Sequence, residues 1–193
     1  DFGDGITDTV QDPAHLFNGD GIYNVTFGVV TVNGCLDTLT QPILVHSLPI
    51  ADYTFAANCV SEIASFTDQS TVASDSIIGW VWDFGNGDSA FVTDPNEQFN
   101  GESDYSVTLI VSSSWGCVDT VVDTVSIVPN PIANFTFEAS CYPDQVLFVD
   151  SSYIDNSIAA HNIVDWYWGF GDLTVDSTQS PTNHQYPNAG SFE

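Results

Sequence analysis

The sequence predicts an all-β chain of tandem, seven-stranded antiparallel β-sandwiches. One stretch recurs along the chain, as Trp82-Asp83-Phe84-Gly85, Asp1-Phe2-Gly3 and Trp168-Gly169-Phe170-Gly171. Asp83 lies 82 residues after Asp1 and 86 residues before Gly169, a period that fits one small domain rather than one turn of a solenoid. Short apolar runs also alternate with turn residues about every ten positions, without longer helical periodicity.

The first copy is predicted to contribute a β-hairpin. Every second residue is apolar from Tyr23 to Val29, which indicates a half-buried strand over residues 22–29. A tight turn at Asn33-Gly34 leads into a return strand over residues 36–45. The side chains of the return strand that we expect to face inward are those of Leu39, Ile43 and Val45.

The central copy contains all seven expected strands. They are predicted at residues 53–56, 63–67, 77–84, 90–93, 97–99, 105–112 and 118–128. In the third of these strands Trp80, Trp82 and Phe84 share one face, because side chains alternate along a strand. This aromatic row is expected to form the core, and each buried ring should contribute about 2–3 kcal/mol.

The third copy repeats the order of strands with one longer loop. Strands are expected at residues 135–137, 146–148 and 166–168. Trp166 follows Asp150 by 16 residues, whereas Trp80 follows Asp68 by 12, so the extra residues belong to the loop around 154–163. A loop that varies within a fixed frame is a natural place for function specific to one repeat.

The repeats predict three domains, at residues 1–47, 48–129 and 130–193. The first copy lacks its front part and the third copy lacks its end, so we interpret the chain as a window on a longer protein. Short proline-bearing junctions at residues 48–51 and 130–133 join the copies. Such junctions restrict the angle between neighbours, which predicts an end-to-end rod.

The charge of the chain excludes several classes of partner. It has 26 acidic residues, no Lys and no Arg, and its formal net charge is −26. Nucleic acids and anionic membranes bind to basic patches, so we expect neither as a partner. No apolar run is long enough to cross a membrane, so membrane insertion of this segment is not expected. The hydrophobic content of 43% still predicts folded modules.

Several motifs occur in the same order in the repeats and resemble those of the polycystic-kidney-disease (PKD) type domain. In the central copy they are Trp82-Asp83-Phe84-Gly85-Asn86-Gly87, Asp94-Pro95, Phe99 and Tyr105-Ser106-Val107-Thr108-Leu109. His15-Leu16-Phe17 and His184-Gln185-Tyr186 are similar to the family's His-x-Tyr step, where the central copy has Glu97. The third copy departs from the pattern at Gly169 and Leu173.

This resemblance implies immunoglobulin-type sandwiches that serve outside the cell. Such domains are spacers or adhesion modules, or they accompany secreted hydrolases. We therefore expect a non-catalytic stalk, adhesin or surface-filament component of a larger secreted protein. The alternative is a carbohydrate-binding accessory array of a secreted hydrolase. Expected partners are neighbouring repeats, other copies in a filament, or a surface or carbohydrate ligand.

Four cysteines recur with the repeats. Cys35 and Cys117 follow turn glycines, and Cys59 and Cys141 precede the second strand of their copies. Repeated cysteines in even number favour an oxidising, extracellular setting. One pairing joins Cys59 to Cys117 within the central domain. The other joins each of them to a stacked neighbour, because the two loops lie at opposite ends of a sandwich, about 20 Å or more apart. Both pairings stay open.

Two acidic turns are the only metal candidates. Asp4, Asp8 and Asp12 lie near one turn, and Asp83 and Asp88 lie near its counterpart. Their oxygen atoms could bind calcium, although a solvated acidic turn without metal explains them more simply. The repeated positions of His15 and His184 favour a structural hydrogen bond over catalysis. No nucleophile with a base and an oxyanion donor can be assembled, so no enzymatic activity is expected.

A short tripeptide pattern indicates glycosylation sites. Asp followed by Ser or Thr and an apolar residue is similar to the O-glycosylation triplet of one group of Gram-negative bacteria. The alternative is that Asp, Thr and Val are simply abundant in this chain. The candidate acceptors are Thr9, Thr38, Ser76, Ser89, Thr120 and Thr124.

Overall fold

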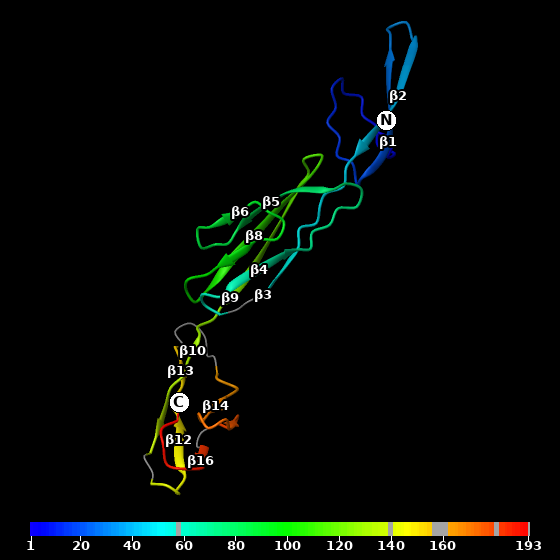
Figure 1. Ribbon diagram of the computed structural model, residues 1–193. Helices are drawn as coiled ribbons and strands as arrows, with labels where there is room; N and C mark the ends of the chain where they lie inside the picture. Colours follow the sequence, from blue (N-terminus) through cyan, green and yellow to red (C-terminus); the bar gives the residue numbers. More distant parts are fainter. Residues whose placement is uncertain (57–58, 139–140, 156–161, 180–181, 193) are drawn as a thin grey trace. The chain divides into compact units, whose positions relative to one another are not determined.

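The computed structural model describes residues 1–56, 59–138, 141–155, 162–179 and 182–192, and every regular element among them is a β-strand (Figure 1). No helix in this described part is long and apolar enough to span a membrane. The chain forms two compact units. One unit holds Asp1–Ala57, Ile63–Glu97 and Tyr105–Val125, and the other holds Asn58–Glu62, Gln98–Asp104 and Ser126–Glu193.

The first repeat forms the predicted hairpin. Strand β1 (Gly21–Val30) pairs with β2 (Leu36–Val45) in a two-stranded antiparallel sheet. The prediction that Leu39 and Ile43 face inward is wrong, because both side chains are exposed. The physical reason is that this sheet has only two strands, and no described strand packs over Leu39 or Ile43.

The central repeat is the predicted antiparallel sandwich of two sheets. One sheet has the strand order β3-β4-β7 and the other has the order β6-β5-β8-β9. The bounds are β3 Tyr53–Ala56, β4 Ile63–Asp68, β5 Ile77–Asp83, β6 Ser89–Ala90, β7 Asn96–Gln98, β8 Ser103–Ser113 and β9 Val118–Ile127. All seven predicted strands are present, and the predicted and observed boundaries differ most at β6, which was expected at residues 90–93.

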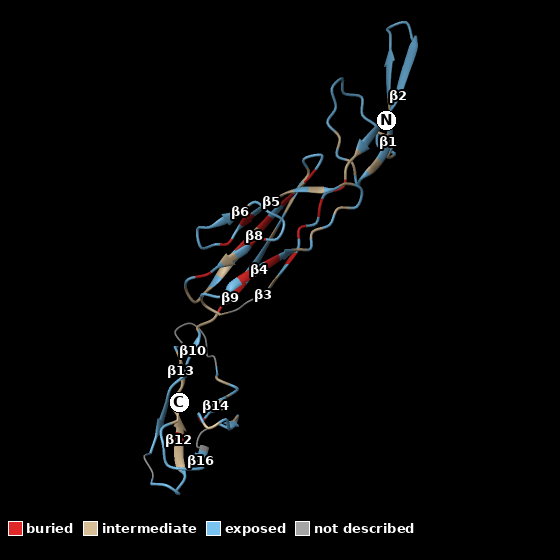
Figure 2. Ribbon diagram, in the orientation of Figure 1, coloured by how far each residue is buried: buried red, intermediate tan, exposed pale blue. Residues whose placement is uncertain are grey.

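Aromatic side chains form the core between these sheets. Trp82, Phe84 and Phe66 are almost completely buried, and the buried residues in Figure 2 follow β4, β5 and β8. The Trp82 indole also donates a hydrogen bond to the carbonyl of Val92 at 2.9 Å. Trp80 departs from the prediction, because it is only half-buried. Its indole donates a hydrogen bond to the Asp68 carboxylate at 2.8 Å.

The third repeat forms three small sheets, with orders β11-β12-β16, β10-β13 and β14-β15. The bounds are β10 Pro131–Ile132, β11 Phe135–Phe137, β12 Val146–Asp150, β13 Tyr153–Ile154, β14 Trp168–Gly169, β15 Val175–Asp176 and β16 Thr182–His184. The predicted strands at 135–137 and 146–148 are present. Only Trp168 of the predicted strand at 166–168 belongs to β14, and most of the expanded loop, residues 156–161, lies outside the described residues.

The turn after β14 keeps the geometry of its counterparts despite its unusual sequence. Gly87 in the central repeat has a φ of +99°, and Leu173 takes the same place with a φ of +74°. The Leu173 side chain is fully exposed. A left-handed conformation costs a residue with a Cβ about 1–2 kcal/mol, and nothing in the surroundings offsets this cost.

Leu173→Gly is therefore expected to stabilise the third repeat by about 0.5–1 kcal/mol, after the greater backbone entropy of glycine in the unfolded chain is counted. The measurement is the midpoint of urea unfolding. Leu173→Ala keeps the Cβ and should give no comparable gain. An equal gain from both variants would show that the exposed leucine side chain, not the backbone, causes the effect.

Candidate functional site

A hydrogen bond across the turn after the recurring motif is present in all three repeats, and we call it the turn clasp. In the first repeat, Nε2 of His15 lies 2.7 Å from Oδ2 of Asp4. The His15 ring stacks on Phe2, with centroids 4.0 Å apart, and is nearly perpendicular to the ring of Phe17, with centroids 4.7 Å apart. The imidazole is thus fixed by one carboxylate and two aromatic rings.

The third repeat reproduces this arrangement. His184 Nε2 lies 2.9 Å from Oδ2 of Asp172, and the ring stacks on Phe170 with centroids 4.0 Å apart. The ring of Tyr186 is perpendicular to that of His184, with centroids 4.6 Å apart. Because two repeats hold histidine in the same way, the geometry supports a structural role for both histidines rather than a catalytic one.

The central repeat makes the same bond with both residue types exchanged. Nδ2 of Asn86 donates to Oε1 of Glu97 at 2.9 Å. Asn86 replaces Asp4, and Glu97 replaces His15. The donor and the acceptor have therefore changed sides, while one carboxylate and one nitrogen donor remain. A paired exchange of this kind indicates that the bond itself is what the fold requires.

The clasp lowers the pKa of its aspartates. The hydrogen bond with His15 is the largest cause that holds the pKa of Asp4 below its usual value of 3.8. For Asp172 the Thr174 hydroxyl is the largest cause, and His184 adds to it. A carboxyl with a lowered pKa stabilises the fold above its usual value. This contribution is lost as the pH falls through the lowered pKa, so the clasps should weaken in acid, below about pH 3.8.

Exchanging the clasp residues tests this account. His15→Glu places a second carboxylate beside Asp4, so we expect a lower midpoint of urea unfolding at pH 7. The double variant Asp4→Asn/His15→Glu recreates the central pair and should recover most of the loss, which a double-mutant cycle measures. The deficit of the single variant should also shrink below pH 3.8, where carboxylates become neutral. A double variant as unstable as His15→Glu alone would contradict the clasp.

The predicted calcium ligands do not converge in the described structure. Within the described ranges no group of three or more His, Cys, Asp or Glu side chains lies close enough to hold a metal ion. Asp4 accepts a hydrogen bond from the backbone amide of Ile6, and Asp8 accepts from those of Thr9 and Val10. Asp83 similarly accepts from the Gly85 amide. No described contact joins Asp12 or the side chain of Asp88 to these residues, and calcium binding stays a prediction.

All four cysteines are free thiols in the structure. Cys35 and Cys141 are exposed, and Cys59 and Cys117 are half-buried. Cys117 directly precedes β9, whereas Cys59 forms a backbone bridge with Val128, directly after β9. Burial is the main cause that raises the pKa of the Cys59 thiol, and Glu62 raises it further. The predicted Cys59–Cys117 bridge is therefore absent from the structure, whereas the pairing with stacked neighbours is not tested by it and stays a prediction.

The six glycosylation candidates are all on the surface. Thr9, Thr38, Ser76, Ser89, Thr120 and Thr124 are exposed. An attached sugar needs a solvent-facing hydroxyl, so each of these positions could carry one. Intact mass spectrometry of the natural protein tests this prediction, and a mass without added hexose would remove it.

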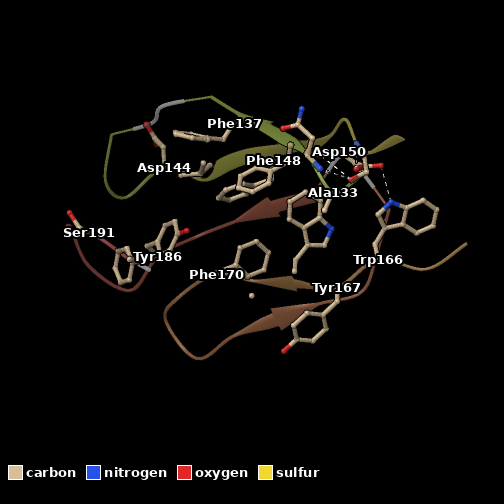
Figure 3. Close-up of a pocket in the computed structure, with 18 of the residues that line it drawn as sticks. Ala133, Phe137, Asp144, Phe148, Asp150, Trp166, Tyr167, Phe170, Tyr186 and Ser191 are labelled. Atoms are coloured by element: carbon tan, nitrogen blue, oxygen red, sulfur yellow. Dashed lines mark hydrogen bonds between the residues drawn. The ribbon is translucent and has the colours of Figure 1, made fainter. Parts of the chain in front are cut away.

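The third repeat contains an apolar groove that the sequence did not predict (Figure 3). Its volume is about 1090 Å³, and aromatic side chains of β11, β12 and β14 line much of it. Phe137, Phe148, Phe170 and Tyr186 surround the opening in Figure 3. At the edge of the groove, Asp150 accepts a hydrogen bond from the Trp166 indole at 2.9 Å, as Asp68 does from Trp80. These lining residues repeat the core positions of the central sandwich.

Sequence reasoning also missed a junction within the first unit. His46 stacks on Trp115, with centroids 4.2 Å apart and planes at 19°. Next to it, the Ser47 hydroxyl bonds to Asp20 and, at 2.8 Å, to the Ser74 hydroxyl. No spacing rule relates these residues, which come from the first and the central repeat. The isolated histidine carried no signal that could have identified its partner.

Comparisons with known proteins found one family model and several relatives that match part of the chain. The family model described as PKD domain matches residues 46–127. The microbial collagenase of Vibrio alginolyticus is 38% identical over 69 residues, which is 35% of this chain but only 8% of the collagenase. The chain thus matches less than a tenth of the length of this curated relative.

Three solved structures are similar over part of the chain. The PKD1 domain of Vibrio anguillarum Epp is 22% identical, with a TM-score of 0.41 over 42% of this chain and 95% of that one. The PKD1 domain of the Vibrio cholerae metalloprotease PrtV is 26% identical, with a TM-score of 0.39 over 42% and 96%. A carbohydrate-binding module of the β-sandwich superfamily is 16% identical, with a TM-score of 0.42 over 53% and 58%. The family match and the two-sheet sandwich of the central repeat thus agree that residues 46–127 are similar to a PKD domain.

Proposed function

We propose that this chain is a non-catalytic structural segment of a larger secreted protein, acting as a stalk, adhesin or surface-filament component. The observation that carries the proposal is that the residues of the recurring motif have structural roles. In the central repeat Trp82 and Phe84 are core, and Asn86 closes the clasp. These three residues of the motif thus stabilise the fold. A segment built this way serves by its shape and stiffness, and it supports a domain rather than performing a reaction.

The junction between the first and the central repeat supports a fixed arrangement of neighbours. The stack of His46 on Trp115 and the bonds of the Ser47 hydroxyl tie the two repeats together. Within the central repeat, the backbone amide of Ala51 at the end of the junction donates to the Asp119 carboxylate at 2.9 Å and fixes the junction segment. We extend this to the domain boundaries 1–47, 48–129 and 130–193, with each proline-bearing junction restricting the angle between neighbours.

Small-angle X-ray scattering of the 193-residue chain tests the stalk proposal. A strand of ten residues is about 33 Å long, so three end-to-end repeats should give a maximum dimension of roughly 100 Å and a rod-like distance distribution. His46→Ala/Trp115→Ala should broaden that distribution, because it removes the stack at the first junction. A compact, nearly spherical particle would contradict the proposal.

A second candidate is the alternative that the sequence raised, a carbohydrate-binding accessory segment of a secreted hydrolase. The observation that favours it is the 38% identity to part of a collagenase. Co-sedimentation with insoluble polysaccharides and with collagen fibres tests it, with the chain as probe and serum albumin as control. Saturable binding to either solid would favour the accessory role. The absence of binding to both would favour the stalk role. Both candidates place the protein outside the cell.

A further inference from the structure

An Asn-Gly step lies inside the clasp of the central repeat. The side chain of Asn86 closes the clasp through Glu97, and Gly87 follows Asn86 in the turn. Both residues of the step are exposed to solvent. Asn-Gly is the dipeptide in which asparagine deamidates most readily, because glycine has no Cβ to shield its backbone nitrogen and its backbone rotates freely. The clasp of this repeat therefore depends on a chemically labile amide.

The reaction at this step needs only water as a co-reactant. The backbone nitrogen of Gly87 attacks Cγ of Asn86, the bond from Cγ to Nδ2 breaks, and ammonia leaves with the proton of the Gly87 amide. Water then opens the cyclic imide. Attack of water at Cγ leaves an aspartate at this position. Attack at the main-chain carbonyl of Asn86 leaves an isoaspartate, which adds one methylene group to the backbone of the turn.

Three features of the turn favour this reaction at Asn86. The backbone amide of Asp88 donates to Oδ1 of Asn86 at 2.9 Å, where it can stabilise the negative charge that develops on this oxygen during the attack. No hydrogen bond in the described part of the chain occupies the backbone amide of Gly87, which is the attacking group. A Cβ at Gly87 would meet nothing within 4 Å, so no neighbouring atom crowds this side of the turn.

Asn33-Gly34, in the turn between β1 and β2, provides a comparison with the same dipeptide. Both residues are exposed, but the Gly34 amide donates to the carbonyl of Thr31 at 2.9 Å. This bond occupies the nitrogen that would have to attack. Among the described residues, none donates to Oδ1 of Asn33, so the reaction there lacks the stabilising amide that Asn86 has. Asn33 is therefore expected to react more slowly in the folded chain.

Deamidation removes the donor on which this clasp depends. Nδ2 of Asn86 lies 2.9 Å from Oε1 of Glu97, and the reaction replaces it with a carboxylate oxygen. Two like charges at this distance repel each other. The first and third repeats hold an aspartate at the equivalent position, but they pair it with His15 or His184. The central repeat has a second carboxylate where those repeats have the imidazole.

We propose that Asn86 is a site of spontaneous deamidation, and that this modification opens the clasp of the central repeat. The central sandwich then loses the bond across its turn and becomes less stable as the protein ages. The clasps of the first and third repeats contain no amide side chain, so they are unaffected. This inference goes beyond the structural role proposed above, because it assigns a modification site and its consequence to one repeat.

Peptide mapping by mass spectrometry measures the reaction. Trypsin has no cleavage site because the chain lacks Lys and Arg, but chymotrypsin cleaves after Phe and Leu. The chymotryptic peptides 85–91 and 28–36 each hold one asparagine, Asn86 and Asn33. When the folded full chain is incubated in mildly alkaline buffer, peptide 85–91 should gain about 1 Da about tenfold faster than peptide 28–36. In concentrated urea, where the turns are unfolded, both peptides should react at similar rates.

Substitutions in the full chain test the effect on the clasp. Asn86→Asp reproduces one product of the reaction and should lower the midpoint of urea unfolding. The double variant Asn86→Asp/Glu97→His rebuilds the pair of the first repeat and should recover most of the loss. Asn33→Asp makes the same chemical change in a turn without a clasp, so it should leave the midpoint near that of the wild type.

These outcomes decide the proposal. Faster reaction at Asn86 than at Asn33 in the folded chain, together with a loss of stability that Glu97→His reverses, supports it. A reaction at Asn86 that is no faster than at Asn33 overturns it, as does an Asn86→Asp variant as stable as the wild type. Far-UV circular dichroism shows whether each variant is folded, and an unfolded Asn86→Asp that Glu97→His does not restore also contradicts the proposal. The stalk proposal is judged separately by the scattering experiment, which a chain that does not deamidate can still pass.

Discussion

Gly85→Ala is expected to destabilise the central repeat by about 3–5 kcal/mol. Gly85 has a φ of +71°, a conformation that costs a residue with a Cβ about 1–2 kcal/mol. A Cβ at this position would also lie 2.6 Å from the carbonyl oxygen of Ser106 on β8, where no flexible side chain can move aside. The first repeat shows the same close approach, because a Cβ at Gly3 would lie 2.7 Å from the carbonyl oxygen of Asn24.

The neighbouring glycine separates the two causes. Gly87 has a φ of +99°, but a Cβ there would meet nothing within 4 Å. Gly87→Ala should therefore cost only about 1–2 kcal/mol. Urea unfolding of both variants, followed by circular dichroism, measures the difference. Equal losses would show that the close approach of the turn to β8 does not limit this position.

Trp82→Ala is expected to destabilise the same repeat by about 3–5 kcal/mol, the usual cost of removing a large buried aromatic ring. Trp82 is fully buried, and its ring lies against those of Tyr53 and Phe66. The substitution leaves a cavity in the middle of the core and removes the hydrogen bond to the carbonyl of Val92. Unfolding free energies from urea titration measure the loss.

Trp115→Ala is the matched control for this prediction. It removes the same side chain, but Trp115 is 65% exposed and its ring contact is the stack on His46. Its loss should be below about 1 kcal/mol. If both tryptophans cost the same, the core would not be centred on the recurring motif.

The sequence was a good guide wherever the signal was local. Alternation and turn residues predicted the strands of the central repeat, and β3 and β2 have the predicted bounds. The repeat period also placed a strand at the recurring motif in the central and third copies, as β5 and β14. These features depend on a few neighbouring residues, which the sequence displays directly.

Features that depend on a second layer were not predictable. Leu39 and Ile43 have an inward-facing pattern, yet they are exposed because no described strand covers the hairpin. The clasp was predicted only as a structural role for His15 and His184. The equivalent bond in the central repeat, between Asn86 and Glu97, could not be predicted without the fold. These two residues lie on different elements, and the exchange of donor and acceptor hides the repeated pattern. The groove likewise depends on how β11, β12 and β14 lie together in space, which the sequence does not display.

Amide hydrogen exchange of the full chain tests the central claim, that the recurring motif builds the core of each repeat. The account predicts the slowest exchange in β5 and β8, whose backbone bonds surround Trp82 and Leu109 in a closed sandwich. The described strands of the third repeat should exchange faster, because Phe135 of their aromatic cluster is 51% exposed whereas its counterpart Tyr53 is buried. Exchange in β5 as fast as in exposed loops would contradict the claim.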